Sequence, residues 1–196
     1  MDISLLTILE WTSVLLNLLY VILLTREIVW AWPAGILGSA IGLFVLFDAK
    51  LYNDVWLFVL YVILGIYGWY AWVYGGKNNK QPPIIHTKLR EGLVFLTLGA
   101  LGTAVLGSTF AQLTDADIPY WDAFTSSFSV VGTYMQARKH LQNWLLWIIV
   151  DGVYIGVYWY KGLTAFAILS IIYLVLAAYG YWEWRKHFRA AKGMGA

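Results

Sequence analysis

Seven long stretches of mostly apolar residues divide this chain of 196 residues. A helix needs about 20 such residues to cross the hydrocarbon core of a bilayer. The stretches that approach this length are 5–24, 29–47, 52–74, 92–113, 121–137, 142–160 and 163–184. Only 12% of the residues are charged, against about a quarter in soluble domains, so the chain could not cover itself in water. We therefore predict an all-α integral membrane protein with seven transmembrane helices.

The fifth stretch, 121–137, is the least apolar of the seven. Its polar residues are three serines, two threonines and a glutamine: Thr125, Ser126, Ser127, Ser129, Thr133 and Gln136. Polar side chains are costly where a helix meets lipid and are tolerated where it lines the protein interior or a wet cavity. We expect this helix to turn its polar side inward.

Lysine and arginine fall almost entirely on one side of the predicted spans. That side holds Arg26, Lys77, Lys80, Lys88, Arg90, Arg138, Lys139, Arg185, Lys186, Arg189 and Lys192, and the other holds Lys50 and Lys161. By the positive-inside rule the richer side is cytoplasmic. The first stretch follows no basic region, so it is interpreted as a span and not as a signal peptide. We predict a multi-pass protein of the bacterial inner membrane, with the N-terminus outside and the C-terminus in the cytoplasm.

The sequence contains an internal repeat: two parts of the chain align, without a gap, at a constant difference in residue number. This repeat offset pairs Arg26 with Arg138, Trp32 with Trp144, and the aromatic segment 67–72 with 179–184. It predicts two three-helix repeats joined by a linker helix, a 3+1+3 arrangement with parallel repeats. The expected division is a first repeat at 1–74, a loop, linker helix and external loop at 75–120, and a second repeat with a basic tail at 121–196. Transporter sites lie where such repeats meet.

Asp151 is the one acidic residue near the middle of a predicted span. A carboxylate at the bilayer centre costs at least about 2.5–3.5 kcal/mol on insertion scales, and no lysine or arginine lies at a comparable depth. Asp151 is therefore a candidate substrate-binding residue. The alternative is a protonated or hydrogen-bonded interior residue that contacts Ser127 or Asn17.

Aromatic residues share a helical face with Asp151. The face is spaced three and four residues apart: Trp144, Trp147, Asp151, Tyr154 and Tyr158. Aromatic rings with a carboxylate suit an organic cation. The matching positions of the first repeat are small after Trp32, namely Gly35, Ser39 and Gly42, so we expect open space there. Asn17, matched by Ser129, is the other deep polar residue, and Pro33 marks either a hinge or a helix start.

Two segments give the chain a family resemblance. They are ARK at 137–139 followed by NWLLW at 143–147, and YGWYAW at 67–72. The chain resembles the PnuC family of bacterial vitamin transporters over nearly its whole length. This resemblance implies a SWEET-like fold, with facilitated uptake of an unphosphorylated vitamin that an intracellular kinase then traps.

Two departures from the family pattern concern the substrate. Nicotinamide riboside members usually have W-x-x-W-x-x-x-N, and this chain has Asp151 at the last position; they also tend to have Gln where this chain has Phe58. The differences favour the thiamine-transporting branch, often called PnuT, with nicotinamide riboside as the alternative. The substrate-binding residues expected from this resemblance and the spacing are Asn17, Trp32, Phe58, Tyr61, Trp144, Trp147, Asp151 and Tyr154.

Other classes of protein fit the sequence less well. A membrane enzyme would need an improvised site, since His86, His140 and His187 all lie in loops or the tail, and there is no cysteine. A retinal protein would need a lysine in the last span, and residues 163–184 contain none. We expect no cofactor, no metal and no nucleic-acid partner; a channel and a homo-oligomer stay open.

Overall fold

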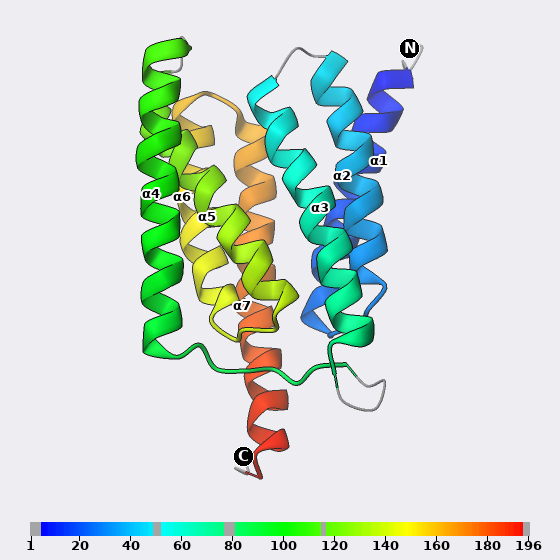
Figure 1. Cartoon of the computed structure of the whole chain (residues 1–196). Coiled ribbons are helices and arrows are strands. Elements are labelled where there is room, and N and C mark those ends of the chain that lie inside the picture. Colours follow the sequence, from blue (N-terminus) through cyan, green and yellow to red (C-terminus); the bar gives the residue numbers. More distant parts are fainter. Residues whose placement is uncertain (1–4, 49–51, 77–80, 115–116, 194–196) are drawn as a thin grey trace. The chain divides into compact units, whose positions relative to one another are not determined.

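The computed structural model of this protein describes residues 5–48, 52–76, 81–114 and 117–193 (Figure 1). Within these ranges the chain forms α1 (Leu5–Thr25), α2 (Ala31–Asp48), α3 (Tyr52–Tyr74), α4 (Leu89–Leu113), α5 (Pro119–Ala137), α6 (Asn143–Tyr160) and α7 (Thr164–Ala191). Each predicted stretch coincides with one helix, and the ends differ by at most three residues except at α7. That helix continues beyond the apolar stretch to Ala191, through a segment that contains Arg185, Lys186 and Arg189. Pro33 lies in the first turn of α2, so it marks a helix start.

Five of the helices are long and apolar enough to cross a membrane by length and composition. They are α1, α2, the Val55–Tyr74 part of α3, α4 and α7. Helix α5 is more polar. Five of its six serine, threonine and glutamine side chains are buried, namely Thr125, Ser127, Ser129, Thr133 and Gln136, and Ser126 is half-buried. The expectation that α5 turns its polar side inward is confirmed.

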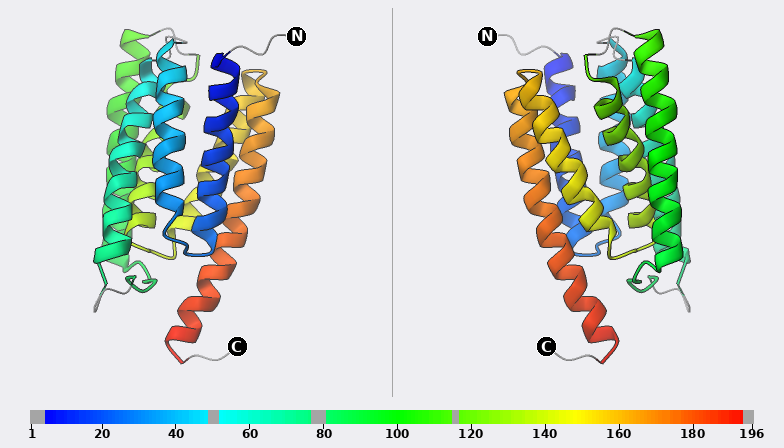
Figure 2. Two further views of the ribbon diagram at one scale, coloured as in Figure 1. Left: turned by 90° about the vertical axis from the view of Figure 1, so that its right-hand side faces the viewer. Right: turned by 90° about the vertical axis from the view of Figure 1, so that its left-hand side faces the viewer.

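The helices belong to two compact units, Met1–Pro83 and Ile84–Ala196. In the first unit, α2 packs against both α1 and α3. In the second, α4 packs against α5, α5 against α6, and α6 against α7. Figure 2 shows the helices of each unit running alongside one another. The linker helix α4 is thus packed onto the second three-helix repeat.

An extended segment before α4 is fixed to the turn between α5 and α6. The Ile85 amide donates to the Lys139 carbonyl at 2.9 Å, and the Leu141 amide donates to the Ile85 carbonyl at 2.8 Å. The Thr87 amide donates to the Gln142 side chain at 2.7 Å. Burial lowers the pKa of His140 in this turn; Glu91 acts in the opposite direction and Arg138 in the same direction. These contacts hold the start of α4 beside the start of α6.

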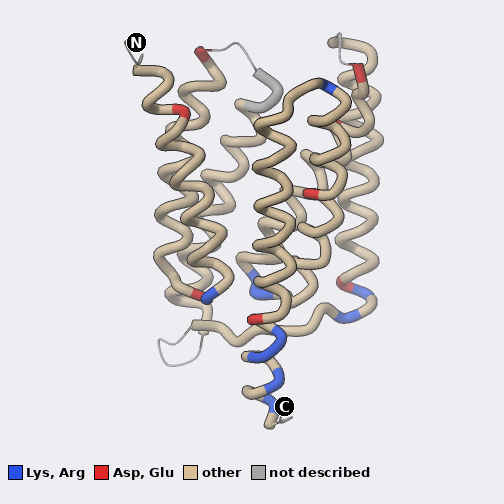
Figure 3. Tube along the Cα trace, turned by 180° about the vertical axis from the view of Figure 1, so that it is seen from behind, with Lys and Arg blue, Asp and Glu red and all other residues tan. Residues whose placement is uncertain are grey.

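Basic residues gather at one end of the second unit (Figure 3). This end holds the start of α4, the α5–α6 turn and the tail of α7. At the opposite end, Lys161 pairs with both carboxylate oxygens of Asp122 at 2.8 Å. Lys50, Lys77 and Lys80 lie outside the described residues.

Candidate functional site

Each unit contains an equivalent pair of buried tryptophans. Trp32 meets Trp72 edge to face in the first unit, with ring centroids 5.6 Å apart. Trp144 meets Trp184 in the same way in the second, at 5.4 Å. The two pairs are related by the repeat offset, and each of the four side chains is at most 1% exposed. A Cβ added to Gly68 or Gly180 would lie 2.4 or 2.7 Å from the first tryptophan of its pair, so the rings are closely fitted.

The turns that precede these tryptophans also match. Glu27 and Lys139 are paired by the repeat offset, and both have a positive φ, 56° and 53°. The Ile28 amide donates to the Leu23 carbonyl, and the His140 amide donates to the Met135 carbonyl at the matching positions. Residues other than glycine rarely adopt this backbone conformation. Its occurrence at both positions supports the repeat independently of any aromatic residue.

The two repeats differ in which helix carries the bulky side chain. In the first, the Tyr20 ring of α1 covers Gly35 of α2, with a built Cβ only 2.8 Å from that ring. In the second, the Trp147 ring of α6 covers Gly132 of α5 at 3.0 Å. Tyr20 aligns with Gly132 and Gly35 aligns with Trp147, so the large and small residues are exchanged.

The expectation of open space beside the small residues of α2 is wrong, because side chains from the neighbouring helices fill that space. Gly38 is covered by the Asn17 side chain, and Gly42 by the Phe58 ring. Small residues on α2 let α1 and α3 approach closely, which is a common use of glycine and serine in membrane helices. In the first unit, side chains from α1 and α3 therefore fill the space beside α2. In the second unit, the side chains of α6 itself fill the corresponding space.

Asp151 lies on α6 and is 4% exposed. Among the described residues, no donor lies within hydrogen-bond distance of its carboxyl group, and no cation pairs with it. The Ser127 hydroxyl, one of the alternative partners, is itself buried without a hydrogen bond to any described residue. Tyr173 of α7 lies close enough to interact with Asp151 electrostatically. A buried polar group without a hydrogen-bond partner can be stabilised by a ligand that donates a hydrogen bond to it.

The aromatic residues near Asp151 have different partners. Trp147 is half-buried beside α5, and its indole N–H is buried without an acceptor among the described residues. Tyr154 and Tyr158 stack with centroids 5.3 Å apart and an interplanar angle of 8°. Trp144 instead packs against α7 through Trp184 and Gly180. The rings of Trp144 and, at the matching position, Trp32 are buried within their own bundles, and their indole N–H groups are likewise without an acceptor among the described residues.

Three predicted residues lie together in the first unit. The Asn17 amide donates to the Ser13 carbonyl at 3.0 Å, and the Phe58 and Tyr61 rings meet at 5.8 Å. The repeat offset pairs Tyr61 with Tyr173, so Tyr173 could have been found from the repeat. Within the described residues no group of three histidines or acids could hold a metal.

The comparisons with known proteins cover most of the chain. The sequence profile of a family described as nicotinamide mononucleotide transporter matches residues 7–186. The nicotinamide riboside transporter PnuC of Escherichia coli is 25% identical over 175 residues, which cover 76% of this chain and 73% of that protein. The riboflavin/roseoflavin transporter RibM of Streptomyces davaonensis is 26% identical over 181 residues, which cover 89% and 84%.

A solved structure has the same fold. The crystal structure of the vitamin B3 transporter PnuC matches with a TM-score of 0.74 and 20% identity, over 93% of this chain and 82% of that one. The predicted fold, with seven helices in a 3+1+3 order, is confirmed by this likeness. From the profile match over residues 7–186, the chain belongs to the nicotinamide mononucleotide transporter family.

Proposed function

We propose that this protein mediates facilitated uptake of nicotinamide riboside across the bacterial inner membrane, with trapping by intracellular phosphorylation. The observation that carries the proposal is the buried Asp151 carboxyl, which has no hydrogen-bond donor among the described residues. Nicotinamide riboside offers that group hydroxyl and amide N–H donors, together with a cationic ring. The names of the relatives point to nicotinamide riboside and riboflavin, and they give the expected thiamine specificity no support.

The charge distribution favours an unphosphorylated substrate. Arginine and lysine occur in the helices only near the ends, at Arg90 in α4 and from Arg185 onward in α7. A phosphate at the depth of Asp151 would therefore find a carboxyl group and, among the described helices, no cation. A buried charge without a partner is costly, so this arrangement disfavours the mononucleotide relative to its unphosphorylated nucleoside.

The proposed contacts centre on Asp151 and Trp147. Asp151 accepts a hydrogen bond from the ligand, and Trp147 provides a ring face together with an indole N–H that no described residue accepts. Tyr154 and Tyr173 belong to the same unit as these two residues. Asn17, Phe58 and Tyr61, which the sequence also predicted as substrate-binding, belong to the first unit. Trp32 and Trp144 are packing residues in this proposal.

Thiamine is the second candidate, because an aspartate stands at the position where nicotinamide riboside members usually have asparagine. A carboxylate accepts from the thiamine aminopyrimidine, whereas an asparagine can also donate to the nicotinamide carbonyl. We expect Asp151→Asn to weaken thiamine binding and favour nicotinamide riboside if Asp151 accepts from the aminopyrimidine. The same substitution should weaken nicotinamide riboside binding if Asp151 accepts from the hydroxyl or amide groups of that vitamin.

The experiment is a binding titration of purified protein with nicotinamide riboside, thiamine, riboflavin and nicotinamide mononucleotide. We expect nicotinamide riboside to bind most tightly and the mononucleotide most weakly. Proteoliposomes should equilibrate the preferred vitamin without ATP or an ion gradient, and accumulate it only with a matching kinase and ATP inside. Uphill accumulation driven by an ion gradient alone would contradict facilitated transport. Preference for thiamine would overturn the substrate while leaving the transport class intact.

The proposed orientation puts the C-terminus in the cytoplasm. The second unit supports it, since the basic residues at one of its ends greatly outnumber Lys161 at the other. A cytoplasmic reporter fused after Ala196 should be active and a periplasmic one silent, and the opposite result would reverse the direction of the whole chain.

A further inference from the structure

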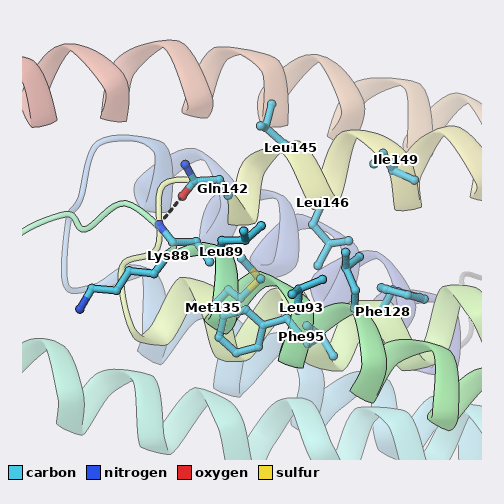
Figure 4. A pocket seen from close by; sticks show the side chains of 14 residues that line it. Lys88, Leu89, Leu93, Phe95, Phe128, Met135, Gln142, Leu145, Leu146 and Ile149 are labelled. Atoms are coloured by element: carbon cyan, nitrogen blue, oxygen red, sulfur yellow. Dashed lines mark hydrogen bonds between the residues drawn. The ribbon is translucent and has the colours of Figure 1, made fainter.

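A groove runs along the outside of the second unit between α4, α5 and α6 (Figure 4). Its volume is about 330 Å³. Its rim is exposed, with Leu89 80%, Leu93 55% and Ile149 55% accessible. Its floor includes Phe128 and Met135, which are 7% and 4% exposed. The groove is therefore an apolar furrow on the outside of the second unit.

The floor of the groove is fixed in place by close packing. A Cβ built on Gly99 of α4 would lie 2.4 Å from the Phe128 ring, so glycine is needed for the ring to lie where it does. Gly92, which lines the groove, has no such neighbour: its built Cβ would meet only the Thr87 methyl group, at 3.8 Å. The groove is thus a feature of the helix packing, and a glycine keeps its wall open.

The polar lining is confined to one end. Figure 4 shows Lys88 and Gln142 at that end, whereas Phe128 and Ile149 lie at the other. Gln142 accepts a hydrogen bond from the Thr87 amide, and the Thr87 hydroxyl bonds to His140 at 3.1 Å. The Lys88 ammonium is exposed, and no carboxylate of the described residues lies within ion-pair distance of it.

We propose that this groove binds an acyl chain of an anionic phospholipid, with the headgroup phosphate held at Lys88. The walls of the groove are apolar, as a hydrocarbon chain requires, and the exposed Lys88 charge lies at the end where the chain would meet its headgroup. Arg90 and Arg138 add positive charge at this end and outnumber the one carboxylate there, that of Glu91, which accepts a hydrogen bond from the Lys88 amide at 3.0 Å. Basic pockets between membrane helices on the cytoplasmic side suit anionic headgroups.

The vitamin of the proposed function fits this groove poorly. A cationic substrate would be repelled by Lys88, and its hydroxyl and amide groups would find no partner along the apolar walls. A zwitterionic lipid would place a second cation among the basic residues. An anionic lipid suits both parts of the groove, since its acyl chain matches the apolar walls and its headgroup phosphate matches the Lys88 charge.

The test is native mass spectrometry of the purified full-length protein with added phosphatidylglycerol or phosphatidylcholine. We expect phosphatidylglycerol to bind more tightly. The Lys88→Ala variant should weaken phosphatidylglycerol about fivefold, the contribution of one basic residue near an anionic surface, and should leave phosphatidylcholine unchanged. Lys192→Ala, which removes the same charge from the exposed tail, should bind phosphatidylglycerol like the parent protein.

A second pair of variants tests the groove itself. Leu146→Trp should fill it and displace the lipid, whereas Leu101→Trp, on α4 outside the groove and 58% exposed, should have no effect. If Leu146→Trp does not fold, Leu145→Trp on the rim takes its place.

Three outcomes would overturn the proposal. Equal binding of the two lipids, insensitive to Lys88, would remove the headgroup contact. Displacement of the lipid by free glycerol phosphate alone would show a phosphate site without a chain. A complex of several protein copies that binds no lipid and separates in Leu146→Trp would show that a second copy occupies the groove.

Discussion

The two three-helix repeats are alike near the tryptophan pairs and differ around Asp151. Trp32 on Trp72 and Trp144 on Trp184 have nearly the same centroid distances, and each first tryptophan lies over a glycine. One and two helical turns further along α2 and α6 the chemistry changes: Gly35 matches Trp147 one turn on, and Ser39 matches Asp151 two turns on. The two repeats therefore share their packing around the tryptophans and differ in the side chains beyond them, where the proposed vitamin contacts lie.

The packing role of the tryptophans predicts the largest effect. Trp32→Ala and Trp144→Ala should each lower the free energy of unfolding by about 3–5 kcal/mol, since each leaves a large cavity inside its bundle. Denaturant titration in detergent measures this loss. Trp159→Ala on α6, whose side chain is 72% exposed, is the matched control and should change stability little. A Trp144→Ala protein with parental stability but no vitamin binding would make Trp144 a ligand contact instead.

The difference between Asp151 and Ser39 predicts the next effect. Asp151→Ala should weaken binding of the vitamin roughly 10- to 150-fold, because a hydrogen bond to a charged group contributes about 1.5–3 kcal/mol. Ser39→Ala, at the matching position of the first repeat, should cost at most about tenfold, since only a neutral hydroxyl is lost. Calorimetric titration of both variants gives the comparison. Equal losses would mean that the two repeats contribute alike to the ligand.

The glycines beneath the tryptophans test how closely the two bundles agree. Gly68→Ala and Gly180→Ala should each destabilise by about 1–3 kcal/mol, because the added methyl meets a ring that a second tryptophan holds in place. Gly156→Ala on α6 meets nothing within 4 Å and should stabilise by up to about 1 kcal/mol. Thermal unfolding of the three proteins separates the effects. If Gly180→Ala left the stability unchanged while Gly68→Ala lowered it, the second bundle would be the less tightly packed of the two.

The ion pair at the far end of the second unit predicts the smallest effect. Lys161→Ala should cost less than about 1 kcal/mol, because both partners are partly exposed, with 27% of each side chain accessible. A double-mutant cycle with Asp122→Ala isolates the pair, and the coupling should shrink further in high salt. A coupling energy well above the roughly 1 kcal/mol that limits exposed pairs would indicate that this pair is shielded from solvent.

The sequence alone determined the seven helices, the 3+1+3 order, the inward side of α5 and the position of Asp151. These follow from local properties: the length of an apolar stretch, the cost of a charge in lipid, and the spacing of residues on one helix. The repeat offset also aligned Trp32 with Trp144 and the segment 67–72 with 179–184.

Only the tertiary structure decided what each of these side chains touches. Spacing placed Trp144 and Trp147 on one face of α6, but the helix crossings direct Trp144 onto Gly180 of α7 and Trp147 onto Gly132 of α5. The small residues of α2 predicted open space, and Tyr20, Asn17 and Phe58 fill it from neighbouring helices. Periodicity within one helix fixes the face of a side chain, whereas the helix packed against that face determines whether it meets a partner, a ligand or lipid.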